Sequence, residues 1–325
     1  MKNPPTTDQL IAACKHALQQ NLGVQAGERV LIVTDETKRD IAAAFKRACL
    51  QLQANVEKIE IPVLTFNGQE PPEAVAQKML AAQVVLMPLA KSLSWTRARR
   101  AATDAGVRIA SMARITEEMI VRTFPVDYQA IRARVNRLAD LLDQTEQVRV
   151  QSELGTDLCV NVAHRQAHGR SGGIYSQPGK WGNLPCGEAF IAPVQADTSG
   201  IYVVDASHAA VGAIQEPIRI TVENGFATRI DGGAEAQTLR NELQTVGDHN
   251  AYNLAEFGIG CNEHARICGI TLEDEKVLGT CHLALGNNIF FGGEVEVGIH
   301  IDGVLTAPTI HFDAQLIMDR GTLLV

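Results

Sequence analysis

Five acidic and imidazole side chains in the second half of the chain are of the types that bind metal ions. They are Glu188, Glu256, His282, His300 and Asp302. Three carboxylates and two imidazoles suit divalent zinc, cobalt, manganese or iron, and enzymes with two metals hold the ions about 3.5 to 4 Å apart. The sequence therefore predicts a divalent metal centre, provided that the fold brings these side chains together.

The spacing of His300 and Asp302 is the most informative feature, because both lie in the strand-like run Val297 to Leu305. Alternate residues of a strand point to the same face, so the two side chains would lie next to each other and could bind one ion. A surface strand with its polar residues outward has the same pattern. His311 and Asp313 repeat the spacing and offer a second candidate pair.

The other three candidates occur among apolar and small residues. His282 lies in GTCHLALG, Glu256 in NLAEFGIG and Glu188 in PCGEAFIAP. Such surroundings predict burial, and a buried imidazole or carboxylate needs a hydrogen-bond partner or a metal. A hydrogen-bonded core histidine, or a solvated turn for either glutamate, is the alternative for each segment taken alone.

The first 125 residues alternate between strand and helix patterns, which predicts an α/β domain with a parallel sheet. The apolar runs expected to form its strands are residues 29–34, 56–63, 84–87 and 107–110. The loop after the first run, Thr34 to Thr37, lacks the glycines that bind phosphates, so no dinucleotide site is expected. The basic residues Lys91, Arg97, Arg99 and Arg100 are expected on a solvated helix face and are given no chemical role.

A helical pattern with Ile131, Val135, Leu138 and Leu142 follows, and β-type runs dominate from there on. The second half contains a hairpin signal, with Asn224-Gly225 between two apolar runs, and then a helix near residues 235–245. We expect a domain at 1–125, a linking helix at 126–145 and a β-rich α+β metal-binding catalytic domain at 146–325.

Composition and charge argue against a membrane protein and against a protein that binds nucleic acid. The chain has 325 residues, of which 46% are hydrophobic, and its net charge of −8 provides no attraction to nucleic acid or anionic lipid. No run approaches the roughly 18 apolar residues of a membrane span, and the N-terminus has no signal-peptide pattern. Seven cysteines without C-x-x-C spacing favour reduced thiols. We therefore expect a cytoplasmic protein that binds neither membrane nor nucleic acid.

At these motifs the chain resembles the aminopeptidase T and aminopeptidase S family of two-metal metallopeptidases. The segments NLPCGEAFIAP, AE, CHLALG and HID occur in the family's order. The resemblance implies that Glu188 and Glu256 are carboxylate ligands, that His282 and His300 are imidazole ligands, and that Asp302 completes the two sites. It also implies two zinc, cobalt or manganese ions, a small peptide or amide substrate and a homodimer.

The resemblance also bears on the second H-x-D pair. In the family, a segment like Pro308-Thr309 and an acid like Asp313 follow the ligand pair, which favours His300 and Asp302 as the ligands over His311 and Asp313. One feature departs from the family, because the position of its catalytic tyrosine, seven residues after the ligand histidine, is Ile289 here. The segment between His282 and His300 is also short. The general base stays unassigned.

The chain also resembles the 2,5-dihydroxypyridine dioxygenase family, whose members cleave an aromatic ring with iron(II). That family's His-x-Asp matches His300 and Asp302, and its third ligand is a histidine where this chain has Glu256. A triad of two histidines and one carboxylate could form from His282, His300 and Asp302. Five candidate ligands favour a two-metal hydrolase acting on an amide bond over the single-iron dioxygenase. A non-catalytic metal-binding protein on the same fold is the third hypothesis.

Three residues flank the motifs and are candidates for lining a substrate pocket: Trp181, Asn262 and Asn287. Packing and turn formation account for them equally well, so none is assigned a role.

Overall fold

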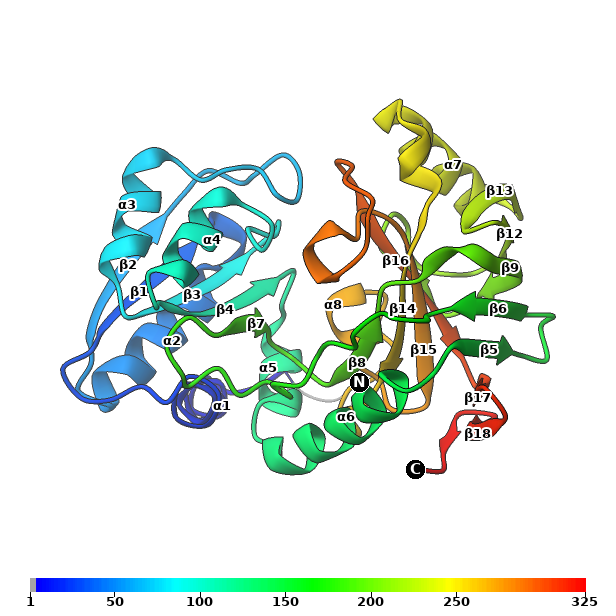
Figure 1. Cartoon of the computed structure of the whole chain (residues 1–325). Coiled ribbons are helices and arrows are strands. Elements are labelled where there is room, and N and C mark those ends of the chain that lie inside the picture. The colour runs from blue at the N-terminus through cyan, green and yellow to red at the C-terminus, as the bar shows by residue number, and fades with distance from the viewer. Residues whose placement is uncertain (1–3) are drawn as a thin grey trace. The chain divides into compact units, whose positions relative to one another are not determined.

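The computed structural model describes residues 4–325, which divide into two compact units. One unit comprises the chain up to Gln129 together with Gly173–Cys186, and the other comprises Ala130–Gly172 together with Gly187–Val325. Figure 1 shows the elements of both. The two units differ in architecture.

The first unit is built on a five-stranded sheet in which every neighbouring pair is parallel, as the sequence predicts. The strand order is β2-β1-β3-β4-β7. The strands are β1 (Arg29–Thr34), β2 (Asn55–Glu60), β3 (Val84–Leu89), β4 (Arg108–Ala113) and β7 (Trp181–Asn183). The inner strands are almost wholly buried, because helices cover the faces of a parallel sheet.

Helices connect these strands. They are α1 (Thr7–Gln20), η1 (Glu36–Lys38), α2 (Arg39–Gln51), α3 (Glu73–Ala81), α4 (Arg97–Asp104) and α5 (Glu117–Thr123). Helix α1 begins with a capping box in which Thr6 and Gln9 satisfy each other's backbone N–H groups. Val75 and Met79 of α3 pack with Ala98 of α4 against Leu31 and other strand residues, which forms the core on one face of the sheet.

The basic cluster is only partly solvated, which corrects the sequence prediction. Arg97 is exposed, but Arg99 is 6% exposed and its guanidinium carbon lies 3.8 Å from the centre of the Trp181 ring. Arg99 also donates to the carbonyl of Ser94 at 2.7 Å. Burial lowers the pKa of Arg99 to about 10. The aromatic partner comes from β7, far along the chain, so no local pattern could indicate it. Trp181 thus serves packing.

Segment 173–186 returns to the first unit, which the predicted division into 1–125, 126–145 and 146–325 does not include. Strand β7 pairs in parallel with β4, so that Ile109 lies opposite Trp181. A strand of three half-buried residues produces no apolar run, and its membership is fixed by backbone pairing. The division between the units falls at Gln129, in the first turn of α6 (Tyr128–Leu142).

The second unit is β-rich, as predicted, and contains two sheets whose strand pairs are antiparallel. The six-stranded sheet has the order β11-β10-β16-β15-β14-β8. Its strands are β8 (Glu188–Ile191), β10 (Ser207–His208), β11 (Gly212–Ala213), β14 (Leu254–Gly260), β15 (Thr280–Gly286) and β16 (His300–Thr306). Strands β14 and β15 are buried along their whole length, so this sheet lies at the centre of the unit.

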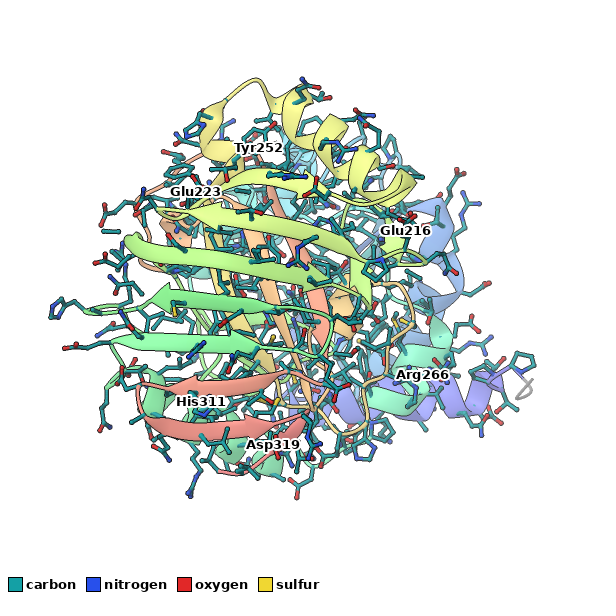
Figure 2. All side chains as sticks on the ribbon, turned by 90° about the vertical axis from the view of Figure 1, so that its right-hand side faces the viewer. Glu216, Glu223, Tyr252, Arg266, His311 and Asp319 are labelled. Carbon is teal, nitrogen blue, oxygen red and sulfur yellow. The ribbon has the colours of Figure 1, made fainter. Side chains whose placement is uncertain are left out.

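The eight-stranded sheet has the order β13-β12-β9-β6-β5-β17-β18-β19, and Figure 2 shows it face-on. Its strands are β5 (Gln147–Gln151), β6 (Asp157–Asn161), β9 (Val194–Val204), β12 (Ile218–Glu223), β13 (Phe226–Asp231), β17 (Thr309–Phe312), β18 (Gln315–Asp319) and β19 (Thr322–Leu323). The predicted hairpin forms between β12 and β13, where Asn224 and Gly225 both have positive φ.

The predicted apolar row of α6 is buried, and the unit has four further helical segments among the described residues, of which only α7 is long. They are α7 (Ala234–Val246), η2 (His249–Tyr252), α8 (Thr271–Asp274) and η3 (Ile289–Phe291). Within residues 4–325, no helix combines the length and apolar character needed to span a bilayer.

Candidate metal centre

Strand register brings the five predicted ligands to one face of the six-stranded sheet. Glu256 of β14 and Asp302 of β16 both lie opposite Ala284 of the intervening strand β15. Directly opposed residues of antiparallel strands project to the same side, and so do alternate residues of one strand. The remaining ligands follow from the same register, since His282 is opposite Gly258, Glu188 is opposite Gly260 and His300 is opposite Gly286.

Several residues opposite the candidate ligands are glycine or alanine, although Val304 of β16 also lies opposite His282. A Cβ atom added to Gly258 would lie 2.1 Å from Nε2 of His282, which is far inside van der Waals contact. Ala284, between Glu256 and Asp302, carries only a methyl group. Gly258 therefore leaves room for the imidazole of His282.

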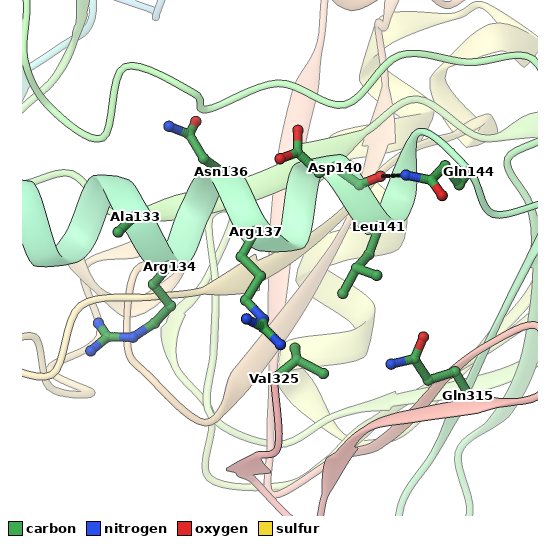
Figure 3. A pocket seen from close by; sticks show the side chains of 9 residues that line it. All are labelled: Ala133, Arg134, Asn136, Arg137, Asp140, Leu141, Gln144, Gln315 and Val325. Atoms are coloured by element: carbon green, nitrogen blue, oxygen red, sulfur yellow. Dashed lines mark hydrogen bonds between the residues drawn. The ribbon is translucent and has the colours of Figure 1, made fainter.

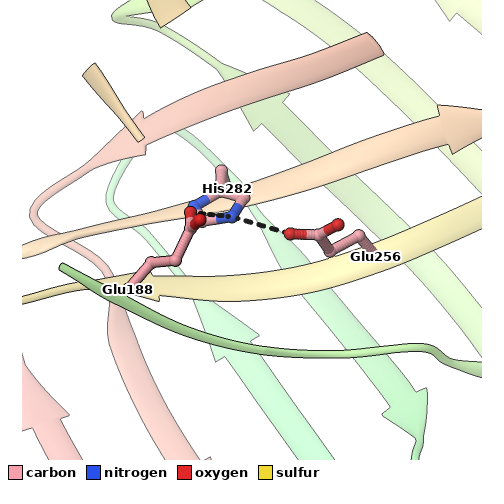
Figure 4. Close-up of side chains that lie close together, drawn as sticks. All are labelled: Glu188, Glu256 and His282. Carbon is pink, nitrogen blue, oxygen red and sulfur yellow. Dashed lines mark hydrogen bonds and ion pairs between the residues drawn. The ribbon is translucent and has the colours of Figure 1, made fainter. Parts of the chain in front are cut away.

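Glu256 is the centre of the group. Its Oε1 lies 3.2 Å from Nε2 of His282, and its Oε2 lies 3.4 Å from Nε2 of His300. His300 Nε2 is also 3.5 Å from Oδ1 of Asp302. On the opposite side, Oε2 of Glu188 lies 3.5 Å from His282 Nε2. Figure 4 shows His282 joined to Glu188 and Glu256.

These contacts form two clusters that share Glu256. One consists of Glu256, His300 and Asp302 and the other of Glu188, Glu256 and His282, with ligand atoms within 4.8 Å of one another in each. The triad suggested by the sequence for a single iron, namely His282, His300 and Asp302, is not among the clusters of the described residues. The carboxylate of Glu256 lies between the two imidazoles.

The two imidazoles differ in their surroundings. The side chain of His300 is 17% exposed, and its Nδ1–H donates to the carbonyl of Asn287 at 2.7 Å. This bond turns Nε2 toward the carboxylates, as second-shell contacts do for metal-binding histidines. The side chain of His282 is fully buried, and its Nδ1 has no hydrogen-bond partner among residues 4–325. Asn287 thus contributes its backbone carbonyl, and its side chain donates to Val297.

A buried lysine completes the site and was missed by the sequence reasoning. Nζ of Lys276, in a side chain that is 1% exposed, lies 2.8 Å from Oε1 of Glu188 and also pairs with Glu275. Both residues follow α8 in the run EDEK, and runs of charge are typical of solvated segments. No signal in the sequence distinguishes this run from a surface turn.

Ion pairing outweighs burial at His282, His300 and Glu256, but not at Glu275. Burial lowers the pKa of His282, but the hydrogen bond to Glu256 and the charge of Glu188 raise it to about 9. The charge of Asp302 likewise raises the pKa of His300 well above its usual value against the effect of burial. The pKa of Glu256 falls despite burial, because His282 and His300 bond to it. At Glu275 burial prevails over Lys276 and raises the pKa to about 8.

Aromatic rings adjoin His300. The ring of Phe291 meets the His300 ring edge to face, with centroids 5.7 Å apart, and Phe190 packs on Phe291 at 5.6 Å. His168 stacks on Phe190 at 5.4 Å, and burial lowers the pKa of His168. Ile289, two residues before Phe291, is exposed. The sequence reasoning did not find these rings, because aromatic residues in apolar segments read as ordinary core.

The second H-x-D pair lies elsewhere. His311 belongs to β17 of the eight-stranded sheet (Figure 2), and Asp313 accepts hydrogen bonds from the backbone of Glu146 and Gln147. Asp313 therefore has a structural role at the start of β5. The structure brings His300 and Asp302, and not this pair, next to the other candidate ligands.

A hollow of about 670 Å³ in the second unit also lies outside the ligand group (Figure 3). It is lined mainly by α6, with Gln315 and Val325 on its other side. None of the five candidate ligands contributes to it. Asn262, the last of the flanking residues, is buried, and its side-chain oxygen accepts from the backbone of His264.

The family model and the curated relative point to the same family. The sequence model of a family described as NicX, 2,5-dihydroxypyridine 5,6-dioxygenase, matches residues 9–325. A curated 2,5-dihydroxypyridine 5,6-dioxygenase from Pseudomonas putida KT2440 is 26% identical over 216 residues, which are 63% of this chain and 61% of that protein. The alignment thus spans about three fifths of the relative.

Two solved structures share the fold. The structure of 2,5-dihydroxypyridine dioxygenase from Pseudomonas putida KT2440 is similar with a TM-score of 0.84 and 22% identity, covering 99% of both chains. Wild-type AmpT from Thermus thermophilus is similar with a TM-score of 0.73 and 17% identity, covering 98% of this chain and 99% of that one.

Proposed function

Because the chain belongs to the NicX family of 2,5-dihydroxypyridine 5,6-dioxygenases, we propose that it is a ring-cleaving dioxygenase with one iron(II) ion. The observation that carries the proposal is the cluster of Glu256, His300 and Asp302. Their side chains are 8%, 17% and 15% exposed, so the cluster is largely shielded from solvent but not sealed. The neighbouring ring of Phe291 suits a flat aromatic substrate.

The prediction of a metallo-aminopeptidase hydrolase is wrong. The family that matches the chain and the curated relative are both dioxygenases, and the likeness to AmpT extends only to the fold. The terms hydrolase, aminopeptidase and metallopeptidase therefore do not apply. The physical reason is that carboxylates and imidazoles serve one-iron oxygenases and two-metal hydrolases alike, so ligand types cannot separate the two. Ile289 stands at the position of the aminopeptidases' catalytic tyrosine, which agrees with a reaction other than peptide hydrolysis.

The residues present fit a divalent first-row ion. His300 offers an imidazole nitrogen whose orientation is fixed by Asn287, and Glu256 and Asp302 offer carboxylate oxygens. Non-haem iron oxygenases commonly use two histidines and one carboxylate, whereas this cluster has one histidine and two carboxylates. The extra negative charge favours retention of a dication. We propose that these three residues hold the iron, and the predicted pair of zinc, cobalt or manganese ions stays unsupported.

A bound iron(II) ion would supply the electron transfer with dioxygen that protein side chains lack. The chain's own residues would position the substrate. Phe291 and the half-buried Phe190 form an aromatic wall beside His300. Phe291 is only 5% exposed, so a dihydroxylated pyridine would pack mainly on Phe190. His168 lies at the end of this wall, and burial lowers its pKa, which favours the neutral imidazole that could accept a proton from a substrate hydroxyl.

Oxygen uptake tests the proposal. Metal-free protein is loaded with iron(II) under nitrogen, mixed with 2,5-dihydroxypyridine and exposed to dissolved oxygen in an electrode cell. We expect one oxygen consumed per ring lost, and no uptake by zinc-loaded protein or by the His300→Ala variant. The matched control is His311→Ala, which alters the other H-x-D histidine and should retain activity. Iron-loaded protein that leaves 2,5-dihydroxypyridine and related dihydroxylated rings intact would refute the proposal.

A further inference from the structure

We infer that Lys276 takes the place of a second metal ion, so that the centre binds a single ion. The inference rests on the metal-binding part of the proposed function and does not depend on which reaction follows. The inference concerns the number of metal ions that the site binds. Two clusters share Glu256, and the ligand types in each would suit a divalent ion.

The first observation is the ion pair at Glu188. The Lys276 ammonium lies 2.8 Å from Oε1 of this carboxylate and also contacts Glu275. A lysine that is 1% exposed is rare unless it is paired, so these two contacts account for its burial. A second dication on Glu188 would share that carboxylate with the ammonium, and the two cations would repel each other in a poorly solvated site.

The second observation is the difference between the two histidines. His300 has the outer hydrogen bond that metal-binding histidines almost always make, whereas Nδ1 of the fully buried His282 has no partner in the described part of the chain. While Lys276 occupies the second cluster, His282 therefore has no outer contact within residues 4–325 that would fix it on a metal ion. Its Nε2–H is well placed to donate to Oε1 of Glu256, at 3.2 Å. We assign it as a positioning residue that holds the shared carboxylate for the ion at His300.

The charges of the site agree with one ion. Four carboxylates, those of Glu188, Glu256, Glu275 and Asp302, surround the ammonium and the two imidazoles. One dication and the ammonium carry three positive charges, which match the three carboxylates of the two clusters, Glu188, Glu256 and Asp302. Without the Lys276 ammonium, the carboxylate of Glu188 would lose its paired cation. The lysine thus determines how many metal ions the site accepts.

Metal stoichiometry tests the inference. Wild type, Lys276→Met and Lys78→Met are dialysed against excess zinc(II) and then against metal-free buffer, and bound zinc per chain is measured by elemental mass spectrometry. Lys78 is the matched control, because its ion pair with Glu57 is exposed. We expect one zinc in wild type and in Lys78→Met, and two in Lys276→Met. Two ions in wild type, or one in a folded Lys276→Met, would overturn the inference.

A second variant decides the matter if Lys276→Met does not fold. Glu188→Gln removes the charge that Lys276 neutralises and alters only the second cluster. We expect it to keep one zinc with unchanged affinity, whereas loss of an ion would overturn the inference. Wild type that binds no zinc would contradict the metal centre itself and the role of Lys276 with it. One bound ion without oxygen uptake would contradict only the proposed reaction.

Discussion

Nε2 of His300 lies 3.5 Å from Oδ1 of Asp302, two positions along the same strand, and both groups belong to one cluster with Glu256. Under the proposed function, loss of either side chain would remove a metal ligand. We expect His300→Ala and Asp302→Ala to lower the affinity for manganese(II), measured by titration calorimetry, by more than the roughly 10- to 100-fold typical of second-shell changes. His311→Ala should leave the affinity unchanged. Equal effects at His300 and His311 would count against the cluster.

Room for His282 depends on the glycine across the strand pair. In Gly258→Ala, the new methyl group would lie 2.1 Å from His282 Nε2, so the imidazole or the strand must shift. We expect the free energy of unfolding to fall by about 1 to 3 kcal/mol, as for other overpacked cores, and metal affinity to fall because Glu256 loses its support.

The control for this variant is Gly298→Ala. A Cβ atom at Gly298 meets no atom within 4 Å, although the residue lies only two positions from His300. Urea unfolding followed by circular dichroism should show no destabilisation of Gly298→Ala beyond about 0.5 kcal/mol. A Gly258→Ala protein as stable as this control would contradict the packing described at His282.

Substrate affinity should depend on the aromatic wall. Phe291 meets His300 edge to face, so Phe291→Leu removes an aromatic surface and keeps a similar volume. Aromatic pairs contribute about 0.5 to 1.5 kcal/mol, which corresponds to a rise in KM of roughly 2- to 10-fold with little change in kcat. Phe290→Leu, next to it but exposed, is the control. A change confined to kcat would assign Phe291 to support of the metal ligand instead.

Acid should destabilise the protein through His208. This residue of β10 is buried, and burial lowers its pKa from 6.5 to about 4, although Asp302 opposes the shift. Because the folded pKa is below the unfolded one, the contribution to stability is complete above pH 6.5 and is lost as the pH falls toward 4. The shift corresponds to about 3 kcal/mol.

His208→Asn keeps an acceptor for the backbone N–H of Ala210 and removes the titrating ring. Its free energy of unfolding, measured in urea at several pH values, should vary less between pH 6.5 and 4 than that of wild type. The exposed His164→Asn should follow the wild-type curve. Parallel curves for all three proteins would exclude His208 as the group responsible.

Much of the fold could be predicted because its signals are local. Apolar runs at residues 29–34 and 84–87 indicate buried strands, and the alternation with helices indicates a parallel sheet. The ligand residues could be singled out for a similar reason, since a charged group in an apolar segment stands out. Their convergence depends on register between β8, β14, β15 and β16, which no single segment encodes.

The features missed are those fixed by contacts between distant segments. Arg99 is buried by Trp181, and Lys276 is buried by Glu188, each from a remote part of the chain. The reaction class was missed for a chemical reason, because hydrolases and oxygenases draw on the same ligand types. Lys276 is the residue that we infer limits the centre to one metal ion. It lies in the charged run EDEK, which in the sequence looks like a surface turn.

The source of the oxygen atoms in the product tests the central claim most directly. Iron-loaded protein is given 2,5-dihydroxypyridine under ¹⁸O-labelled dioxygen in ordinary water, and the ring-opened product is analysed at once by mass spectrometry. A dioxygenase transfers both atoms of dioxygen to the ring, so we predict a product with two labelled atoms. A product that carries oxygen from water alone would mean hydrolysis and would contradict the account.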